Sequence, residues 1–346
     1  MKKTNKIAAL VIILYSFSGV RAQTAEPPEL KEAGELSAQV VRLYGEKKYD
    51  EALPLAKRAL KLREEKLGPE HPLVIASLTN LAEVYLAKEK LGEAEPLYQR
   101  ALAVLEKSTG KPDPRMGQIL DRLALVRFAR EDYGKAEALY RRALEVQEKA
   151  SGPESDEVVE TLGHLVSLYS TRREYDKAKP VLQRIVSIRE KASGPSSAEL
   201  AASLHRLACV MYRNREDAEA QKVESRANDI LYKGKPEPIE LPPDLFNCKL
   251  FKNPYPKYPA RAVRFPGQRV IQVKVEVDET GKVTSARMIS GESAFRDSSK
   301  RAAMSAELRP TLVGGQPVKV SGIIKYQFLT KTSTVIVGPV PGRPRP

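Results

Sequence analysis

The sequence has few of the residues on which most enzymes and metalloproteins depend. Its 346 residues include no tryptophan, two cysteines and three histidines. Two cysteines are too few for a disulfide scaffold, a zinc ribbon or an iron–sulfur cluster. With three histidines, we do not expect a metal or catalytic site built on histidine. A Gly-rich phosphate loop, a Gly-x-Ser-x-Gly sequence and a His-Glu-x-x-His sequence are all missing. We therefore expect no enzyme activity, no cofactor and no metal.

Long apolar runs are missing too, apart from residues 7–20 near the start of the chain. This stretch follows a lysine-rich beginning and leads into Val20-Arg21-Ala22, which fits a cleavage site. As a helix it would span about 21 Å, less than the roughly 30 Å of a bilayer core. We predict that residues 1–22 form a cleaved signal peptide for an exported, oxidising compartment. The alternative is an uncleaved membrane anchor, which a mature chain starting at Gln23 would exclude.

The formal net charge of +14 suggests a polyanionic partner, but the charge is unevenly distributed. Residues 23–243 carry 36 basic and 37 acidic side chains, so this part is almost neutral. Residues 244–346 carry 18 basic and 7 acidic side chains. The positive charge of the mature chain therefore lies on its last third. It suggests an acidic peptide or an anionic envelope surface as a partner, and no nucleic acid is expected in an exported compartment.

The middle of the chain repeats with a period of 42 residues. Segments starting at Ile75, Gly117, Val159 and Ala201 align, with leucine at positions 78, 120, 162 and 204. Each unit has two stretches of helical periodicity, and small residues such as Ala94 and Ala136 recur where closely packed helices would cross. An earlier copy, about residues 33–74, aligns only if one residue is missing before Tyr49. The repeat predicts about five helix pairs over residues 33–232.

This pattern resembles the tetratricopeptide repeat, in the 42-residue form of kinesin light chains. The resemblance implies an all-α solenoid whose first helices line a groove that binds a partner segment. It places one equivalent residue of each repeat in that groove, and this row could hold a peptide carboxylate or an acidic segment. Nearby acidic residues would dilute its positive charge. The fifth copy has Glu224 and Asn228 at apolar positions, which we interpret as a capping repeat facing water. The predicted groove row is Asn80, Arg122, His164 and Arg206.

The composition changes after Lys233. Residues 233–247 are rich in proline and are predicted to be a semi-rigid linker. Alternating apolar residues then predict strands at 271–277 and 283–289, joined by a turn at Asp278–Lys282. A helix over 294–308 and a third strand over 318–328 complete a small α+β domain, residues 248–330, with a three-stranded antiparallel sheet. Residues 331–346 are predicted to be disordered.

The order of these elements resembles the C-terminal domain of TonB, the periplasmic energy transducer. Carrying the resemblance are Tyr258-Pro259 at its start, the hairpin with Gly281, and Gly315 to Val318 before the last strand. In that family an extended segment of an outer-membrane transporter pairs with the exposed last strand. The residues implied to bind such a peptide are Tyr258, Pro259, Val318, Val320, Ile324 and Tyr326.

The sequence thus predicts a multidomain adaptor in the periplasm, with proteins or peptides as partners and an outer-membrane transporter as one candidate. A generic interaction or dimerisation role for the C-terminal domain is the other reading. If residues 7–20 stay uncleaved, the chain would instead be a TonB-type transducer anchored in the inner membrane. The two cysteines, Cys209 and Cys248, fall in different predicted domains, which favours separate thiols over a disulfide. The oligomeric state is not predicted.

Overall fold

The computed structural model describes residues 27–108, 113–259, 268–329 and 335–337. The predicted signal peptide lies outside the described residues. The chain forms two compact units, the first ending at His164 and the second beginning at Leu165, so the boundary falls within a helix. No helix of the described ranges is both long and apolar enough to cross a membrane.

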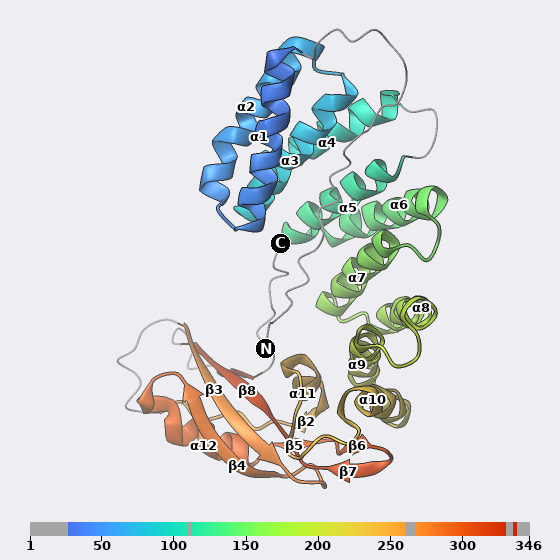
Figure 1. The fold of residues 1–346 in the computed structure, drawn as a ribbon. Coiled ribbons are helices and arrows are strands. Elements are labelled where there is room, and N and C mark those ends of the chain that lie inside the picture. Colours follow the sequence, from blue (N-terminus) through green and yellow to red (C-terminus); the bar gives the residue numbers. More distant parts are fainter. Residues whose placement is uncertain (1–26, 109–112, 260–267, 330–334, 338–346) are drawn as a thin grey trace. The chain divides into compact units, whose positions relative to one another are not determined.

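Ten helices follow one another in five pairs over residues 28–232 (Figure 1), as the repeat predicts. Aspartate or serine caps begin some of them: the Asp113 carboxylate accepts a hydrogen bond from the Arg115 backbone N–H, and the Ser197 hydroxyl accepts one from Leu200. The helices are α1 (Pro28–Gly45), α2 (Tyr49–Leu67), α3 (Pro72–Ala87), α4 (Leu91–Ser108), α5 (Pro114–Ala129), α6 (Tyr133–Ser151), α7 (Asp156–Thr171), α8 (Tyr175–Ser193), α9 (Ala198–Arg213) and α10 (Asp217–Tyr232).

The turn inside each helix pair has the same backbone geometry in all five repeats. One residue of each turn has a φ of 56° to 64°, and these residues lie 42 positions apart. The first repeat therefore has the full period, and the predicted missing residue before Tyr49 is wrong. The residues with positive φ are Lys47, Glu89, Glu131, Arg173 and Arg215.

Small residues let the paired helices pack closely, as the sequence predicts. Ala52, Ala94 and Ala136 are completely buried in the first unit, and Ala178 and Ala220 are completely buried in the second. Large side chains fill the space beside the alanines: Tyr98 is fully buried and Tyr140 almost so. The helix pairs of the first unit share a continuous apolar core that runs from α1 to α5.

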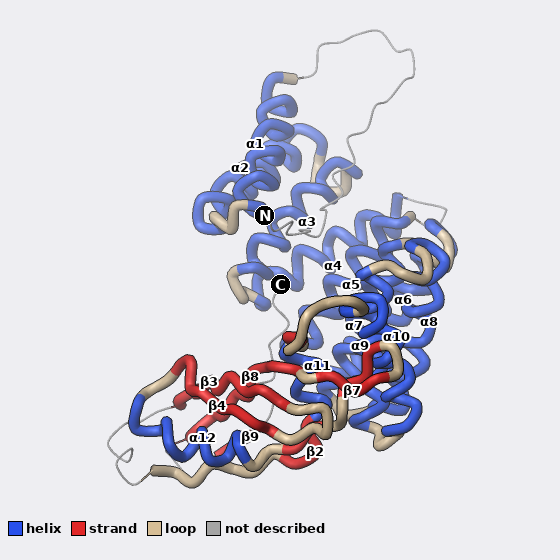
Figure 2. Tube along the Cα trace, turned by 60° about the horizontal axis from the view of Figure 1, so that its bottom comes forward, coloured by secondary structure: helices blue, strands red, loops and turns tan. Residues whose placement is uncertain are grey.

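The C-terminal part of the second unit combines strands with short helices (Figure 2). The predicted helix over 294–308 ends earlier, at Met304, and Phe295, Ala302, Ala303 and Ala306 of this segment are buried. The elements are β1 (Ile239–Glu240), α11 (Pro243–Lys249), β2 (Leu250–Lys252), β3 (Gln268–Val277), β4 (Val283–Ser290), η2 (Ser293–Phe295), α12 (Arg296–Met304), β5 (Glu307–Leu308), β6 (Thr311–Val313), β7 (Gln316–Val318), β8 (Val320–Leu329) and β9 (Val335–Val337).

The main sheet contains the predicted three antiparallel strands and two more. Its order is β1-β8-β3-β4, and β9 also pairs with β8. β3 pairs with β4 and β8 in antiparallel fashion, and its alternate residues Ile271, Val273, Val275 and Val277 are buried. The turn between β3 and β4 requires glycine, because Gly281 has a φ of +91° and a Cβ there would lie 2.0 Å from the Leu308 carbonyl oxygen.

Two segments predicted to lack structure contribute to this sheet. The predicted linker, residues 233–247, contains β1 and most of α11, and Ile239, Leu241, Leu245 and Phe246 belong to the apolar core. Within the predicted disordered tail, residues 335–337 form β9. Both predictions are wrong for these residues. Pro-rich composition suggested a solvated spacer, but the apolar residues between the prolines are buried by the sheet.

The last helix pair is joined to the C-terminal elements inside the second unit. Glu224 and Asn228 on α10 are buried, at 1% and 0% exposed, so the predicted water-facing cap is wrong. Glu224 accepts hydrogen bonds from Lys249, and the Asn228 side-chain amide donates to the Leu312 carbonyl. Polar residues occupy these positions because the C-terminal domain supplies polar partners.

A disulfide joins the same two parts. Cys209 on α9 is bonded to Cys248 on α11, and their Cα atoms are 5.3 Å apart, a usual spacing for a disulfide. The expectation of two separate thiols is therefore wrong. Sequence assigned the cysteines to different domains, and α11 brings them together by packing on α9.

Candidate functional site

The first candidate site is the predicted groove row on the first helices of the repeats. Asn80 on α3, Arg122 on α5 and His164 on α7 belong to the first unit, and Arg206 on α9 belongs to the second. Asn80 is half-buried and Arg206 is exposed. The structure brings Arg122 and His164 into one network through acidic residues that the sequence also placed on this side.

Arg122 is surrounded by three carboxylates. Its Nε donates to Glu83 Oε1 at 3.0 Å, and its terminal nitrogens lie 3.3 Å from Asp121 Oδ2 and Glu160 Oε1. The buried Tyr98 hydroxyl also donates to Glu83, at 2.8 Å. Burial alone would lower the pKa of Arg122, but the three carboxylates together raise it above its usual value. The guanidinium therefore stays charged and is already engaged, so it is not a free cation for a partner carboxylate.

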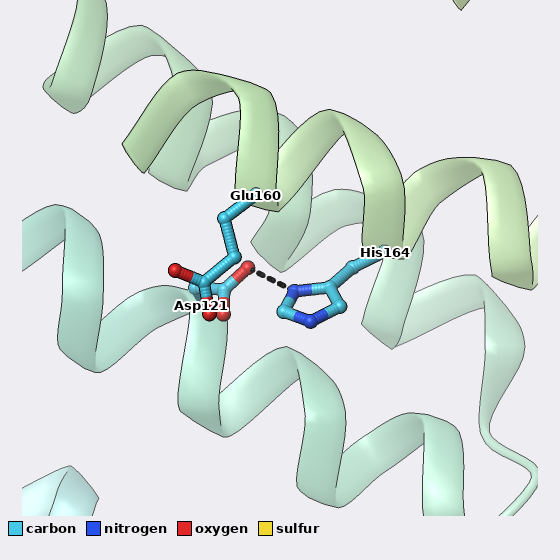
Figure 3. Close-up of side chains that lie close together, drawn as sticks. All are labelled: Asp121, Glu160 and His164. Carbon is cyan, nitrogen blue, oxygen red and sulfur yellow. Dashed lines mark hydrogen bonds and ion pairs between the residues drawn. The ribbon is translucent and has the colours of Figure 1, made fainter. Parts of the chain in front are cut away.

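His164 joins the network from the neighbouring repeat (Figure 3). Its Nδ1 lies 2.8 Å from Asp121 Oδ1, and its ring packs 5.6 Å from that of Tyr140. Glu160 lies one turn before His164 on α7, and both side chains point towards Asp121 on α5. One ligand atom from each of the three residues lies within 4.8 Å of the others.

The charge of this network decides which partner it suits. Three carboxylates face one guanidinium, so the network carries a net charge of about −2 when the imidazole is neutral. Glu160 is half exposed, at 49%, and is the most accessible carboxylate of the three. A divalent metal would have to compete with Arg122, which already contacts Asp121 and Glu160. The arrangement therefore suits a cationic side chain approaching Glu160 better than the acidic segment expected from the sequence.

Arg122→Met is expected to lower the free energy of unfolding of the first unit by about 2–3 kcal/mol, because Glu83 and Asp121 would stay buried without their counter-charge. Unpaired burial raises the pKa of a carboxyl above its unfolded value, so stability should be regained as the pH falls. Urea denaturation at several pH values measures both effects. Arg142→Met, which removes an exposed partner of Glu106, is the control and should change stability by less than about 1 kcal/mol. A loss independent of pH would contradict the unpaired-carboxylate explanation.

In the last repeat the same helix face is covered by the chain itself. Cys209 and Arg213 follow Arg206 by one and two turns on α9. Cys209 is bonded to Cys248 on α11, and an Arg213 Nη lies 3.5 Å from the Asn247 carbonyl oxygen. α11 therefore occupies this end of the first-helix face, and a partner segment has the faces of the earlier repeats.

The second candidate site is the edge of β8. The side chains of Val320, Ile324 and Tyr326 are buried in the core, as is Val318 on β7, so these predicted binding residues present no side chain to a partner. Tyr258 is half-buried, with its ring 5.7 Å from Phe295 and 5.9 Å from Phe328. Pro259 is half-buried beside it. Tyr258 and Pro259 are therefore positioned mainly as packing residues.

The backbone edge of β8 is also not fully open, contrary to the expectation of an exposed last strand. β1 pairs with it in parallel at Val320 and Ser321, and β9 pairs with it in antiparallel fashion from Tyr326 to Phe328. The Ile239 and Leu241 N–H groups donate to the Lys319 and Ser321 carbonyls, so odd-numbered residues direct their backbone groups outward. Ile323 and Lys325 lie between the two added strands.

Comparison with known proteins matches the helical repeats and the C-terminal domain to two different families. A tetratricopeptide repeat model matches residues 42–107 and 115–191, and a model of the Gram-negative bacterial TonB protein C-terminal domain matches residues 254–329. No curated protein matches the chain. The fold of the repeats is similar to solved structures of kinesin light chain TPR-like repeats from Podosopora anserina. One is 22% identical with a TM-score of 0.54 and covers 60% of this chain and 98% of its own. A second, also 22% identical with a TM-score of 0.54, covers 62% and 100%.

Each family model falls on the part of the chain that carries the corresponding helices or strands. Tetratricopeptide repeats and a TonB C-terminal domain together support a role in protein interaction. The chain therefore contains tetratricopeptide repeats over residues 42–191 and, at residues 254–329, a domain of the TonB C-terminal type.

Proposed function

We propose that the protein is an exported adaptor that joins two protein partners. The repeats bind one partner segment on the faces of their first helices, with a cationic side chain of the partner meeting Glu160. The C-terminal domain binds an extended peptide by strand addition on β8. Cleavage after residue 22 would release the adaptor into the periplasm, and an outer-membrane transporter segment is a candidate for the added strand.

One observation carries the strand-addition proposal. The outer edge of β8 already pairs with two segments from elsewhere in the chain, one parallel and one antiparallel. An edge that accepts strands of both directions has the backbone geometry to accept a partner strand. A partner strand that pairs along the whole edge would take the place of β9 and replace its hydrogen bonds to β8. It would also form new hydrogen bonds with the outward backbone groups of Ile323 and Lys325.

A chain ending at Leu329 tests this proposal, with a synthetic peptide of residues 332–339 as the probe. We expect the peptide to bind the shortened chain and to bind Gln327→Pro at least about tenfold more weakly, because proline removes an outward N–H. Gln327→Ala keeps this N–H and is the matched control. Fluorescence anisotropy measures the affinity, and circular dichroism checks that each variant is folded. Equal binding by the proline and alanine variants would overturn strand addition at this edge.

A further inference from the structure

The main sheet has two different faces. Both helices that pack on it, α11 and α12, lie on the apolar face. A Cβ added to Gly322 of β8 would clash with the ring of Phe246 on α11, and Ala302 and Ala303 of α12 belong to the core. The alternate residues of the strands form the opposite face. We call this the basic sheet face, and it includes Val270, Gln272, Lys274 and Glu276 of β3, Arg287 of β4, and Ile323, Lys325 and Gln327 of β8.

Three cations gather on this face because of the strand register. Lys274 pairs directly with Arg287 on one side and with Ile323 on the other. Lys325 lies two residues along β8 from Ile323 and is therefore diagonal to Lys274. Directly paired residues have Cβ atoms about 5 Å apart and diagonal ones about 7 Å, so like charges there repel each other. The sheet keeps this unfavourable arrangement.

Acidic side chains do little to neutralise the three cations. Lys274 lies 3.8 Å from Glu240, which is 65% exposed, and a pair so open to water is weak. Glu276 is the next residue of this face along β3, two residues from Lys274. It pairs with Ser285 and Ser321 and is only diagonal to Arg287, so one carboxylate faces three cations there. Among the described residues, no carboxylate lies within ion-pair distance of Arg287 or Lys325. The face thus presents surplus positive charge on rigid strands.

We propose that the basic sheet face binds an acidic segment of a protein partner. Charge complementarity identifies the partner's sign. The half-buried Ile323 beside Lys274 and the exposed Val270, which pairs with Gln327 beyond Lys325, offer apolar contacts. The three cations span three strands, a width of about 10 Å, which matches one polypeptide segment. This contact uses side chains of the sheet face, so it is independent of strand addition at the edge of β8.

The test compares two triple variants of the full chain that lose the same charge. The first is Lys274→Gln, Arg287→Gln and Lys325→Gln. The second, on the solvent side of α12, is Arg296→Gln, Lys300→Gln and Arg301→Gln. The probe is a fluorescent glutamate-rich peptide, and its glutamine-for-glutamate counterpart is the control peptide. We expect the first variant to weaken binding of the acidic peptide at least about tenfold at low salt and the second to weaken it less than about twofold.

The outcomes decide between a specific face and a general charge effect. Thermal unfolding should show the first variant to be as stable as the parent or more so, because the opposed cations are gone. Equal weakening by both variants would overturn the proposal in favour of net charge alone. Binding to anionic phospholipid vesicles that is lost only in the first variant, without acidic-peptide binding, would overturn it in favour of a lipid surface. Gln327→Pro, which should weaken strand addition at the edge of β8, should bind the acidic peptide as tightly as the parent does.

Discussion

Lys249→Met is expected to lower the free energy of unfolding of the second unit by about 3–5 kcal/mol. The Lys249 Nζ lies 2.6 Å from both carboxylate oxygens of Glu224 and 3.0 Å from the Pro310 carbonyl oxygen. Lys249 and Glu224 are 0% and 1% exposed. Methionine would leave the Glu224 charge in the interior with hydrogen bonds only from neutral groups such as the Tyr212 hydroxyl. Burial lowers the pKa of Lys249 although Glu224 opposes this, so the ion pair itself is held at a cost.

Two further variants show whether the buried charge causes the loss. Glu224→Gln added to Lys249→Met should recover most of the lost stability, since it removes the charge left without a partner. Lys252→Met breaks an exposed ion pair with Glu307 and should cost less than about 1 kcal/mol. Chemical denaturation followed by circular dichroism measures all three. If the double variant is as unstable as Lys249→Met, the loss comes from packing and not from the unpaired carboxylate.

Phe246→Ala is expected to destabilise the second unit by a similar amount, about 3–5 kcal/mol. The Phe246 ring is fully buried against Gly322, where a Cβ would lie 2.1 Å from the ring. Gly322→Ala alone should therefore cost about 1–3 kcal/mol through overpacking. Together the two changes should cost less than their sum, because the new methyl group enters the space that the ring has left.

A double-mutant cycle in urea measures this coupling. Phe251→Ala is the matched control, since the Phe251 ring lies on the same segment but is 56% exposed, and its loss should change stability by about 0.5 kcal/mol. Strict additivity of Phe246→Ala and Gly322→Ala would contradict the close contact between the ring and the strand. A large loss for Phe251→Ala would indicate that the whole segment, and not the buried ring, stabilises the sheet.

Periodicity predicted the parts of the fold that depend on local sequence. The 42-residue repeat predicted the five helix pairs, because Leu78, Ala94 and their equivalents recur at fixed spacing and are buried. The alternation of apolar and polar residues predicted β3, β4 and β8, because one face of each strand packs against the core. Contacts between segments that are distant in the sequence could not be predicted from these patterns. Glu224 looked like a water-facing residue because its partner, Lys249, belongs to another domain.

The segment around α11 shows which signals were available. Proline at several positions suggested a linker, yet Ile239, Leu241, Leu245 and Phe246 together form an apolar set that a solvated spacer would not need. The glycine at position 322, inside a strand, marked a place where another group approaches closely. The four residues of the predicted groove row lie on the first helices of their repeats. Only the structure shows that Arg122 is shared among three carboxylates, so the charge of this row could not be predicted.

The contacts between the last repeat and the C-terminal domain also determine where further repeats can be inserted into the chain. A solenoid usually grows or shrinks by whole repeats, since each repeat contacts only its neighbours. Here the α9–α10 pair carries residues such as Cys209, Glu224 and Asn228 that fit the C-terminal domain and no other repeat. Duplication of an internal 42-residue unit would keep this fit, whereas a copy inserted after α10 would separate it from its partners. Evolution and engineering can therefore lengthen the array from within, but the final repeat has to stay last.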